Sequence, residues 1–269
     1  MGVMTTPDIH VDVLGDGENP ILLLPGGGVR DPIYLGDPAT WGIRRSVAVV
    51  HFRGTPATGG RPRPWWDQGD DLESVRRWLG LGEVDVLAHS AGGRVALAYA
   101  ASGAPLRRIG LITPPATWLT GGTDDVRELA EPRAGDPEIR AALDAPPLSL
   151  SDEEVFERHQ RTTAPLGYAV WDDAARRHSR TGTTDIDALR AFFGSPPPPE
   201  LMARIAALAQ PVHVIGGAQD LLSGNRPVRE LAALFSAGSI EMIDACGHYP
   251  WIDQPAAFAE ALDRWISSR

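Results

Sequence analysis

Short apolar runs separated by turn residues recur along most of the chain, at intervals long enough to hold a helix. Most of the runs are continuous rather than alternating, which is typical of strands covered on both faces in a mostly parallel sheet. They predict strands near Ile9–Leu14, Ile21–Leu24, Val47–Phe52, Val84–Ala88, Ile109–Thr113, Val212–Ile215 and Ile240–Ile243. Helices are expected over Asp70–Leu79, Ala91–Ala101, Pro227–Phe235 and Pro255–Ser267. This alternation predicts an α/β fold, with helices flanking a mostly parallel central sheet.

The alternation stops between about Pro114 and Pro211. This region indicates several short helices, broken at "DAPPLSL", "TTAPLGY" and "GSPPPPEL" and acidic where they begin. The run Pro196–Pro199 suits a stiff return link that leads into the next helix. We therefore expect a core formed by residues 1–113 and 211–269, with residues 114–210 inserted as a helical cap over the strand ends.

Composition narrows the possible partners and the compartment. The net charge of −10 argues against nucleic acid or an anionic membrane as the main partner, so a small-molecule substrate is expected. A single cysteine, Cys246, excludes an internal disulfide framework and suits a reducing cytoplasm. All 25 basic residues are arginine, which suggests a GC-rich bacterial genome. The scattered histidines lack zinc-ligand spacing, and we expect no metal.

The N-terminus shows no secretory signal, because no basic segment precedes an apolar one. Gly2 and Thr6 fit the loose pattern for myristoylation, but no basic patch or second lipid signal accompanies them. No apolar stretch approaches the roughly 18–20 residues that span a bilayer.

The stretch "VLAHSAGGRVALAYA" places Ser90 between a predicted strand and a predicted helix. Residues 88–92 match the G-x-S-x-G nucleophile elbow, with Ala88 in place of the first glycine. Small residues are needed there because the sharp turn brings adjacent strands close to the serine. An alternative is a plain chain reversal that needs only a small residue.

A serine hydroxyl needs a base, and the base needs an orienting acid, in the chain order Ser, Asp or Glu, His. Asp220 and His248 follow the predicted strands Val212–Ile215 and Ile240–Ile243, at the sheet edge expected for Ser90. Asp244 is a second acid near His248, but it lies only four residues before it. The strand that ends at Thr113 is followed by two prolines, which disfavours the other common position for the acid.

An oxyanion formed on the substrate needs preorganised amide donors. We expect them from Ala91 and from the glycine-rich turn "LLLPGGGVRDP", with Gly27 preferred and Gly28 as the alternate. Five of the six other histidines are expected on the surface or in packing, although two of these five could line the pocket. The two that could line the pocket are His51 and His89, and the other three are His159, His178 and His213.

These motifs resemble the α/β-hydrolase superfamily, and within it the proline iminopeptidase-like group, over nearly the whole chain. "LLLPGGGVRDP" looks like that group's H-G-G-P-G segment, "HFRGTPATG" its D-x-R-G-x-G-x-S segment and "GHYPWIDQP" its G-H-x-x-x-x-E-x-P ending. The chain departs from the group at Pro25, His51 and Ala88. The resemblance implies a cofactor-free serine hydrolase with a helical cap, and the departures leave its substrate open.

The resemblance also implies substrate contacts in the cap. Trp171 is followed by Asp172 and Asp173, where similar proteins carry a carboxylate that meets a substrate amine. Trp171 and Trp251 would then supply aromatic walls, whereas the alternative is a helix start with solvated acids. The expected activity is hydrolysis of an ester or amide through an acyl-enzyme. A biosynthetic thioesterase or acyl transferase, or a slow-turnover ligand receptor on the same fold, is the alternative.

Overall fold

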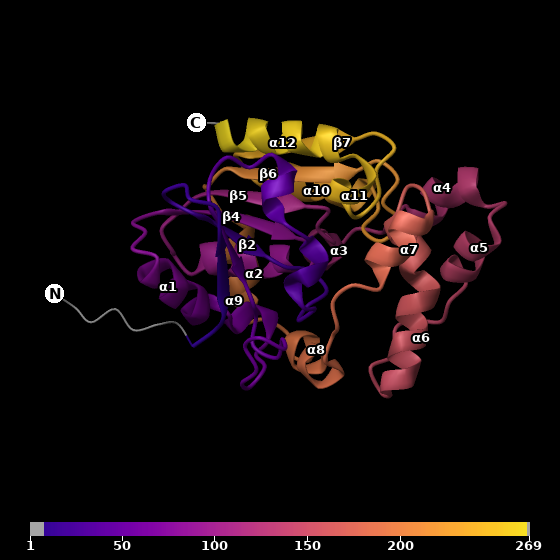
Figure 1. Ribbon diagram of the computed structural model, residues 1–269, viewed down its shortest axis with the longest axis horizontal. Helices are drawn as coiled ribbons and strands as arrows, with labels where there is room; N and C mark the ends of the chain where they lie inside the picture. The colour runs from indigo at the N-terminus through magenta and orange to yellow at the C-terminus, as the bar shows by residue number, and fades with distance from the viewer. Residues whose placement is uncertain (1–7, 268–269) are drawn as a thin grey trace.

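The computed structural model describes residues 8–267, so the pattern at Gly2 and Thr6 lies outside the described part of the chain. Seven strands in this part form one sheet, in the order β1-β3-β2-β4-β5-β6-β7 (Figure 1). They are β1 (Val11–Leu14), β2 (Ile21–Leu24), β3 (Val47–Val50), β4 (Val84–His89), β5 (Leu106–Ile112), β6 (Val212–Gly217) and β7 (Gly238–Ile243). Only β1 runs antiparallel to its neighbour among these strands, which confirms the predicted mostly parallel sheet.

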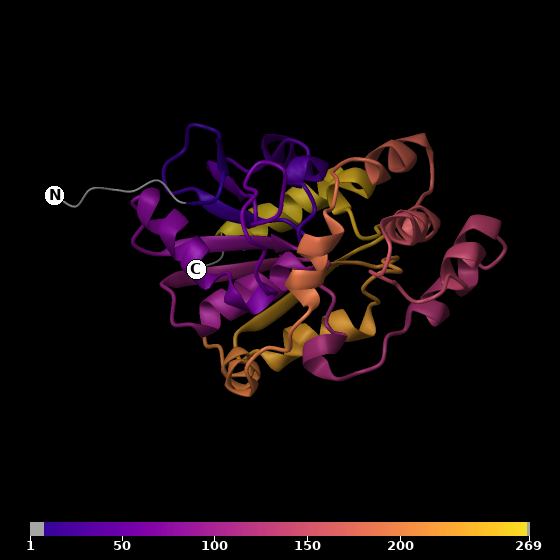
Figure 2. The same cartoon turned by 90° about the horizontal axis from the view of Figure 1, so that it is seen from below.

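Two layers of helices cover the sheet (Figures 1 and 2). One face is covered by α1 (Gly69–Trp78), α2 (Gly92–Ala101), α9 (Pro199–Ala206) and α10 (Arg226–Leu234), the other by α11 (Pro250–Asp253) and α12 (Pro255–Ser267). Along β2, Leu22 and Leu24 join the first apolar cluster, while Ile21 and Leu23 join the second. Because both faces are covered there, β2 and β3 are continuously apolar and buried along their whole length, as predicted for most of the strands.

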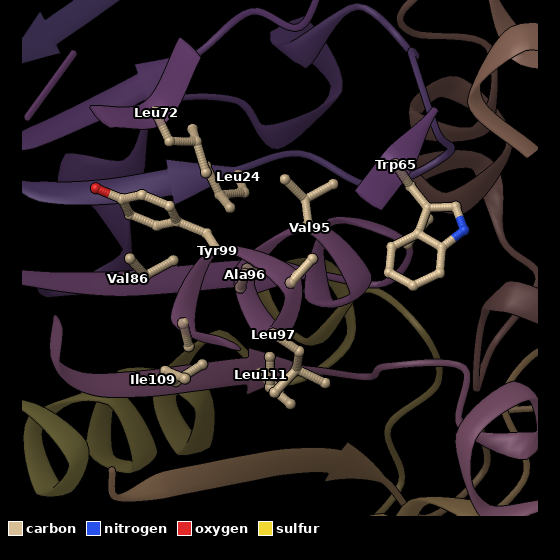
Figure 3. Packing of buried hydrophobic residues seen from close by; sticks show 14 of the residues in the cluster. Leu24, Trp65, Leu72, Val86, Val95, Ala96, Leu97, Tyr99, Ile109 and Leu111 are labelled. Carbon is tan, nitrogen blue, oxygen red and sulfur yellow. The ribbon is translucent and has the colours of Figure 1, made fainter. Parts of the chain in front are cut away.

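The centre of the first cluster is α2, whose apolar side chains pack on the strands beneath it (Figure 3). Val95 and Tyr99 project from α2 toward Leu24 and Val86, and Trp65 lies at the end of this cluster. Trp65 belongs to a short 3-10 helix, η3 (Trp65–Asp67). The helix that follows Ser90 is therefore anchored in the largest part of the core.

The region between β5 and β6 is helical, as predicted. It contains α3 (Thr117–Thr120), α4 (Val126–Ala130), α5 (Pro137–Leu143), α6 (Glu153–Thr163), α7 (Asp173–Ser179) and α8 (Ile186–Phe193), with η4 (Glu131–Arg133) and η5 (Ala164–Gly167). The helices α4–α7 lie beyond the end of the sheet in both views (Figures 1 and 2). In contrast, α9 packs on α2 through Leu201 and Ile205, although it falls within the predicted insertion 114–210.

The strand register brings five loops to one edge of the sheet. Leu24 of β2 pairs with Ala88 of β4, and His89 pairs with Ile112 of β5. Ile112 also pairs with Ile215 of β6, and β6 in turn pairs with β7. The loops that contain the glycine-rich turn, Ser90, Thr113, Asp220 and His248 therefore all begin at this edge. No helix within residues 8–267 has both the length and the hydrophobicity to cross a membrane.

Candidate active site

Ser90 occupies a strained turn between β4 and α2. Its φ of +50° lies in the left-handed region, which a non-glycine residue adopts at a cost that the surrounding structure must offset. The Ser90 amide donates to the Ile112 carbonyl oxygen at 2.8 Å. A Cβ on Gly92 would lie 2.5 Å from the Pro25 carbonyl oxygen, and one on Gly26 would lie 2.8 Å from the Ser90 Cβ. The small residues of the motif thus allow the glycine-rich turn to contact the elbow.

Asp220 and His248, which the sequence pairs, lie together in the structure. Asp220 Oδ2 is 2.9 Å from His248 Nδ1, and both residues are buried, at 2% and 4% exposure. The other carboxylate oxygen of Asp220 accepts from the Leu222 and Ser223 amides, at 2.8 and 3.1 Å. These bonds fix the carboxylate as an acceptor, so His248 directs its Nδ1–H to Asp220. Asp244 is exposed.

The backbone of His248 is held by the side chains of Thr113 and His89, neither of which was predicted to position it. Its carbonyl oxygen accepts from Thr113 Oγ1 at 2.9 Å and lies 3.1 Å from His89 Nε2. Ser223 Oγ donates to the Thr113 carbonyl oxygen at 3.0 Å. Thr113 itself has a φ of +44°, a second strained position at this edge. The loops after β4, β5 and β6 therefore all help to position His248.

Tyr34, from η1 (Pro32–Leu35), connects the glycine-rich turn to the elbow. Its hydroxyl oxygen accepts from the Gly26 amide at 2.5 Å and lies 2.7 Å from His89 Nδ1. Since His89 Nε2 faces a carbonyl oxygen, it carries the proton, and Nδ1 accepts from the Tyr34 hydroxyl. Burial, followed by the nearby His248, lowers the pKa of His89 well below its usual range, so this imidazole stays neutral. His89, which was expected in packing with a pocket-lining role left open, is a buried connector 2% exposed.

The amides of Gly27, Gly28 and Ala91 have no hydrogen-bond acceptor among residues 8–267. Gly27 and Gly28 have φ values of +68° and +74°, a conformation that favours glycine. A Cβ on Gly28 would collide with Leu189 of α8 at 2.6 Å. The turn therefore needs its glycines both for conformation and for close contact with α8.

Contacts of the four expected substrate-binding residues point to structural roles. Asp172 caps α7, since its carboxylate accepts from the Ala175 amide at 2.9 Å, and both Asp172 and Asp173 are exposed. The Trp171 indole donates to Glu138 of α5 at 3.2 Å. Trp251 is only 9% exposed, and its ring lies 4.9 Å from those of Trp41 and His89. In the structure Trp251 supports the elbow from within the core.

His178 joins α7 to the glycine-rich side of the site. Its Nδ1 lies 2.7 Å from the Tyr168 hydroxyl, and its Nε2 lies 2.8 Å from the Tyr34 carbonyl oxygen. Burial lowers the pKa of His178 to about 4. Arg30 adds a second connection, because it donates to the Thr181 carbonyl oxygen beyond α7 and to the Tyr249 hydroxyl, at 3.1 and 3.3 Å. This part of the inserted region is thus fastened to the core beside His248.

His51, a departure from the resemblance, directly follows β3, and its side chain contacts the edge strand β1. Its Nε2 is 2.7 Å from Asp12, and His10 Nε2 is 2.9 Å from the other oxygen of the same carboxylate. Partial burial alone would raise the pKa of Asp12, but the hydrogen bonds from the two histidines lower it. His51 therefore takes part in a histidine–aspartate cluster on β1 and β3 and does not line the site.

Comparisons with known proteins agree with this architecture. The model of a family described as "Alpha/beta hydrolase family" matches residues 21–261. An esterase from Rhodococcus sp. ECU1013 has 20% identity and a TM-score of 0.73, over 97% of this chain and 94% of its own. A thermophilic esterase from Thermogutta terrifontis has 19% identity and a TM-score of 0.63, over 96% of this chain and 92% of its own. An alpha/beta fold hydrolase from Bacillus anthracis has 17% identity and a TM-score of 0.70, over 96% of each chain. The comparison with curated proteins gives no match.

Proposed function

The chain belongs to the alpha/beta hydrolase family, and we propose that it is a serine hydrolase that cleaves carboxylic esters through an acyl-enzyme. The observation that carries this proposal is the buried Asp220–His248 pair, at the same sheet edge as the strained Ser90. A buried acid fixed by two amides has no evident packing role, whereas it suits the orientation of a catalytic imidazole. The fold resemblance to esterases supports ester substrates.

In the proposed reaction, Ser90 Oγ attacks the ester carbonyl carbon while His248 Nε2 takes the hydroxyl proton. Asp220 stabilises the imidazolium that forms. The tetrahedral intermediate collapses as the carbon–oxygen bond to the alcohol breaks, and His248 returns the proton to the leaving oxygen. Water then attacks the acyl-enzyme with His248 as base, which releases the acid and restores Ser90.

We assign the oxyanion hole to the amides of Gly27 and Ala91. Gly27 is preferred to Gly28 because it directly follows Gly26, whose position contacts Ser90. Tyr34 holds the Gly26 amide, so the turn is preorganised before substrate arrives. We also propose that the helices α4–α7 act as the cap over this edge, and that no cofactor takes part.

The experiment that tests this function is turnover of matched chromogenic substrates. We expect the protein to cleave 4-nitrophenyl butyrate, and Ser90→Ala to abolish that turnover. Alanyl and prolyl 4-nitroanilides test the proline iminopeptidase version. Because the Asp172 carboxylate is engaged as a helix cap, we expect esters to be preferred to these anilides. Preferential cleavage of the anilides would replace the esterase proposal with an aminopeptidase.

A further inference from the structure

Arg94, in the first turn of α2, carries a charge that no group of the described chain balances. Within residues 8–267 it forms neither an ion pair nor a hydrogen bond, and its Nε atom is buried without a partner. Arg53, another partly buried arginine, does have a counter-charge, because it forms two hydrogen bonds to Asp71 at 2.8 and 2.7 Å. Arg94 is partly buried, and a cation held there without a counter-charge is costly, which suits a partner from outside the chain.

Aromatic rings from three separate elements surround the guanidinium. Its central carbon lies 5.9 Å from the ring centre of Trp65 in η3, 4.8 Å from Trp118 in α3 and 5.3 Å from Phe193 in α8. Ring faces stabilise the cation in part but leave its in-plane N–H groups without acceptors. The arrangement therefore combines apolar walls with unused donors.

Arg94 also lies on the reacting side of α2. It follows Ser90 by four residues, and helical side chains lean toward the helix N-terminus, which places the guanidinium toward the elbow. Phe193 gives a second reference point, because its ring lies 3.3 Å from where a Gly28 Cβ would be. The ring that contacts Arg94 thus also contacts the glycine-rich turn.

The guanidinium is charged under ordinary conditions. Burial lowers the pKa of Arg94 to about 10, which still leaves it protonated near neutral pH. A planar guanidinium matches a carboxylate through paired hydrogen bonds, and its single charge balances a carboxylate more closely than a phosphate dianion.

We propose that Arg94 binds a carboxylate of the substrate, so that the protein acts on esters that keep one free carboxylate, such as monoesters of dicarboxylic acids. This inference rests on the proposed function, since it names the substrate class of the same site. The aromatic rings hold the methylene chain between the two ends of the acyl group, and Arg94 holds its far end while Ser90 attacks the ester. The Arg94 side chain is a binding group and takes no part in the bond changes.

The first test compares mono(4-nitrophenyl) adipate with 4-nitrophenyl hexanoate, which has the same chain length without the carboxylate. The wild-type kcat/KM should favour the adipate ester, and Arg94→Met should lower the ratio of the two values about 10- to 100-fold, the effect expected for a lost charge-assisted hydrogen bond. Arg94→Lys should recover part of the ratio. Arg44→Gln, an exposed arginine at the opposite edge of the sheet, removes the same charge and should leave both values unchanged.

The second test needs no turnover. In Ser90→Ala, monomethyl adipate should change the tryptophan fluorescence, because Trp65 and Trp118 lie against Arg94. Adding Arg94→Met should weaken this binding about 10- to 100-fold. Equal binding by both variants, or equal loss of the two ester activities in Arg94→Met, would overturn the inference and leave the hydrolase proposal intact. Arg94-dependent binding without cleavage of either ester would instead refute the proposed hydrolysis and support the carboxylate site.

Discussion

The Tyr34 hydroxyl lies 2.7 Å from Nδ1 of the buried His89 imidazole and donates its proton to that nitrogen. It leaves His89 Nε2–H directed at the His248 carbonyl oxygen, 3.1 Å away. Because Tyr34 also accepts from the Gly26 amide, one chain of hydrogen bonds joins the glycine-rich turn, the elbow and the His248 loop. The proposed oxyanion hole, nucleophile and base are thereby held relative to one another.

Tyr34→Phe should break this chain while keeping the ring. The Gly26 amide and His89 Nδ1 would both be left buried without a partner, at a cost of about 1–3 kcal/mol in unfolding free energy. We expect kcat to fall more than KM rises, since Tyr34 acts by positioning. Tyr168→Phe, which removes a similarly buried hydroxyl from His178, is the control for a purely structural loss. Equal kcat effects from the two variants would argue against the positioning role.

The acid assignment is tested by two matched substitutions. Asp220→Asn should keep the fold and lower kcat about 10³–10⁴-fold, because the amide favours the wrong tautomer of His248. Asp244→Asn changes an exposed acid in the His248 loop and should have little effect. Ester turnover by both variants, with circular dichroism to check folding, measures the difference. Severe loss in Asp244→Asn with a near-silent Asp220→Asn would reverse the assignment.

Gly26→Ala should disturb the site by a steric route. The new methyl group would lie 2.8 Å from both the Ser90 Cβ and His89 Nδ1, so the turn or the elbow must shift. Displacement of reacting groups by about 1 Å can lower activity about 10²-fold, and we expect a loss of that order. Gly82→Ala is the control, because its methyl group would meet no atom within 4 Å. Full activity in Gly26→Ala would show that the turn does not need this close approach.

The buried His178 should make the stability of the protein depend on pH. Its folded pKa of about 4 lies below the unfolded value near 6.5, so the unfolded state binds more protons between these values. The contribution of neutral His178 is complete above about pH 6.5 and is lost as the pH falls toward about 4.

Urea unfolding at pH 7 and pH 5 measures this contribution. His178→Phe should lose less stability than the wild type between the two pH values, by about 1–2 kcal/mol after allowance for partial exposure. The neutral His89, which the variant keeps, acts in the same direction in both proteins. The same loss in both proteins would contradict the role of His178.

The strands were predictable because the sheet is covered on both faces, so that most strands contain a short apolar run bounded by turn residues. The four helices predicted between and after the strands could be located because they alternate with the apolar strand runs. Among them, α12 spans the predicted range Pro255–Ser267. The Asp220–His248 contact followed from strand order, since parallel strands bring their following loops to one edge. Local sequence supplied enough information for these features.

The remaining site residues depend on contacts between distant segments. Nothing near Tyr34 in the sequence indicates that its hydroxyl meets His89, 55 positions away. Arg94 gave no signal because an arginine in a helix is ordinarily solvated, and only the packed structure shows that its Nε has no partner among residues 8–267. Asp172, in contrast, could be interpreted from local sequence. The alternative prediction, an acid at a helix start, describes the contact that the structure shows.

The proposed acyl-enzyme mechanism depends most on Ser90 as the nucleophile, and a fluorophosphonate probe tests this role directly. We expect one covalent adduct, located by peptide mass spectrometry on Ser90, with ester turnover lost in proportion to labelling. Ser90→Ala should take up no probe and should lose at least about 10³-fold in kcat. An adduct on another serine, or full ester turnover by Ser90→Ala, would contradict the proposed mechanism.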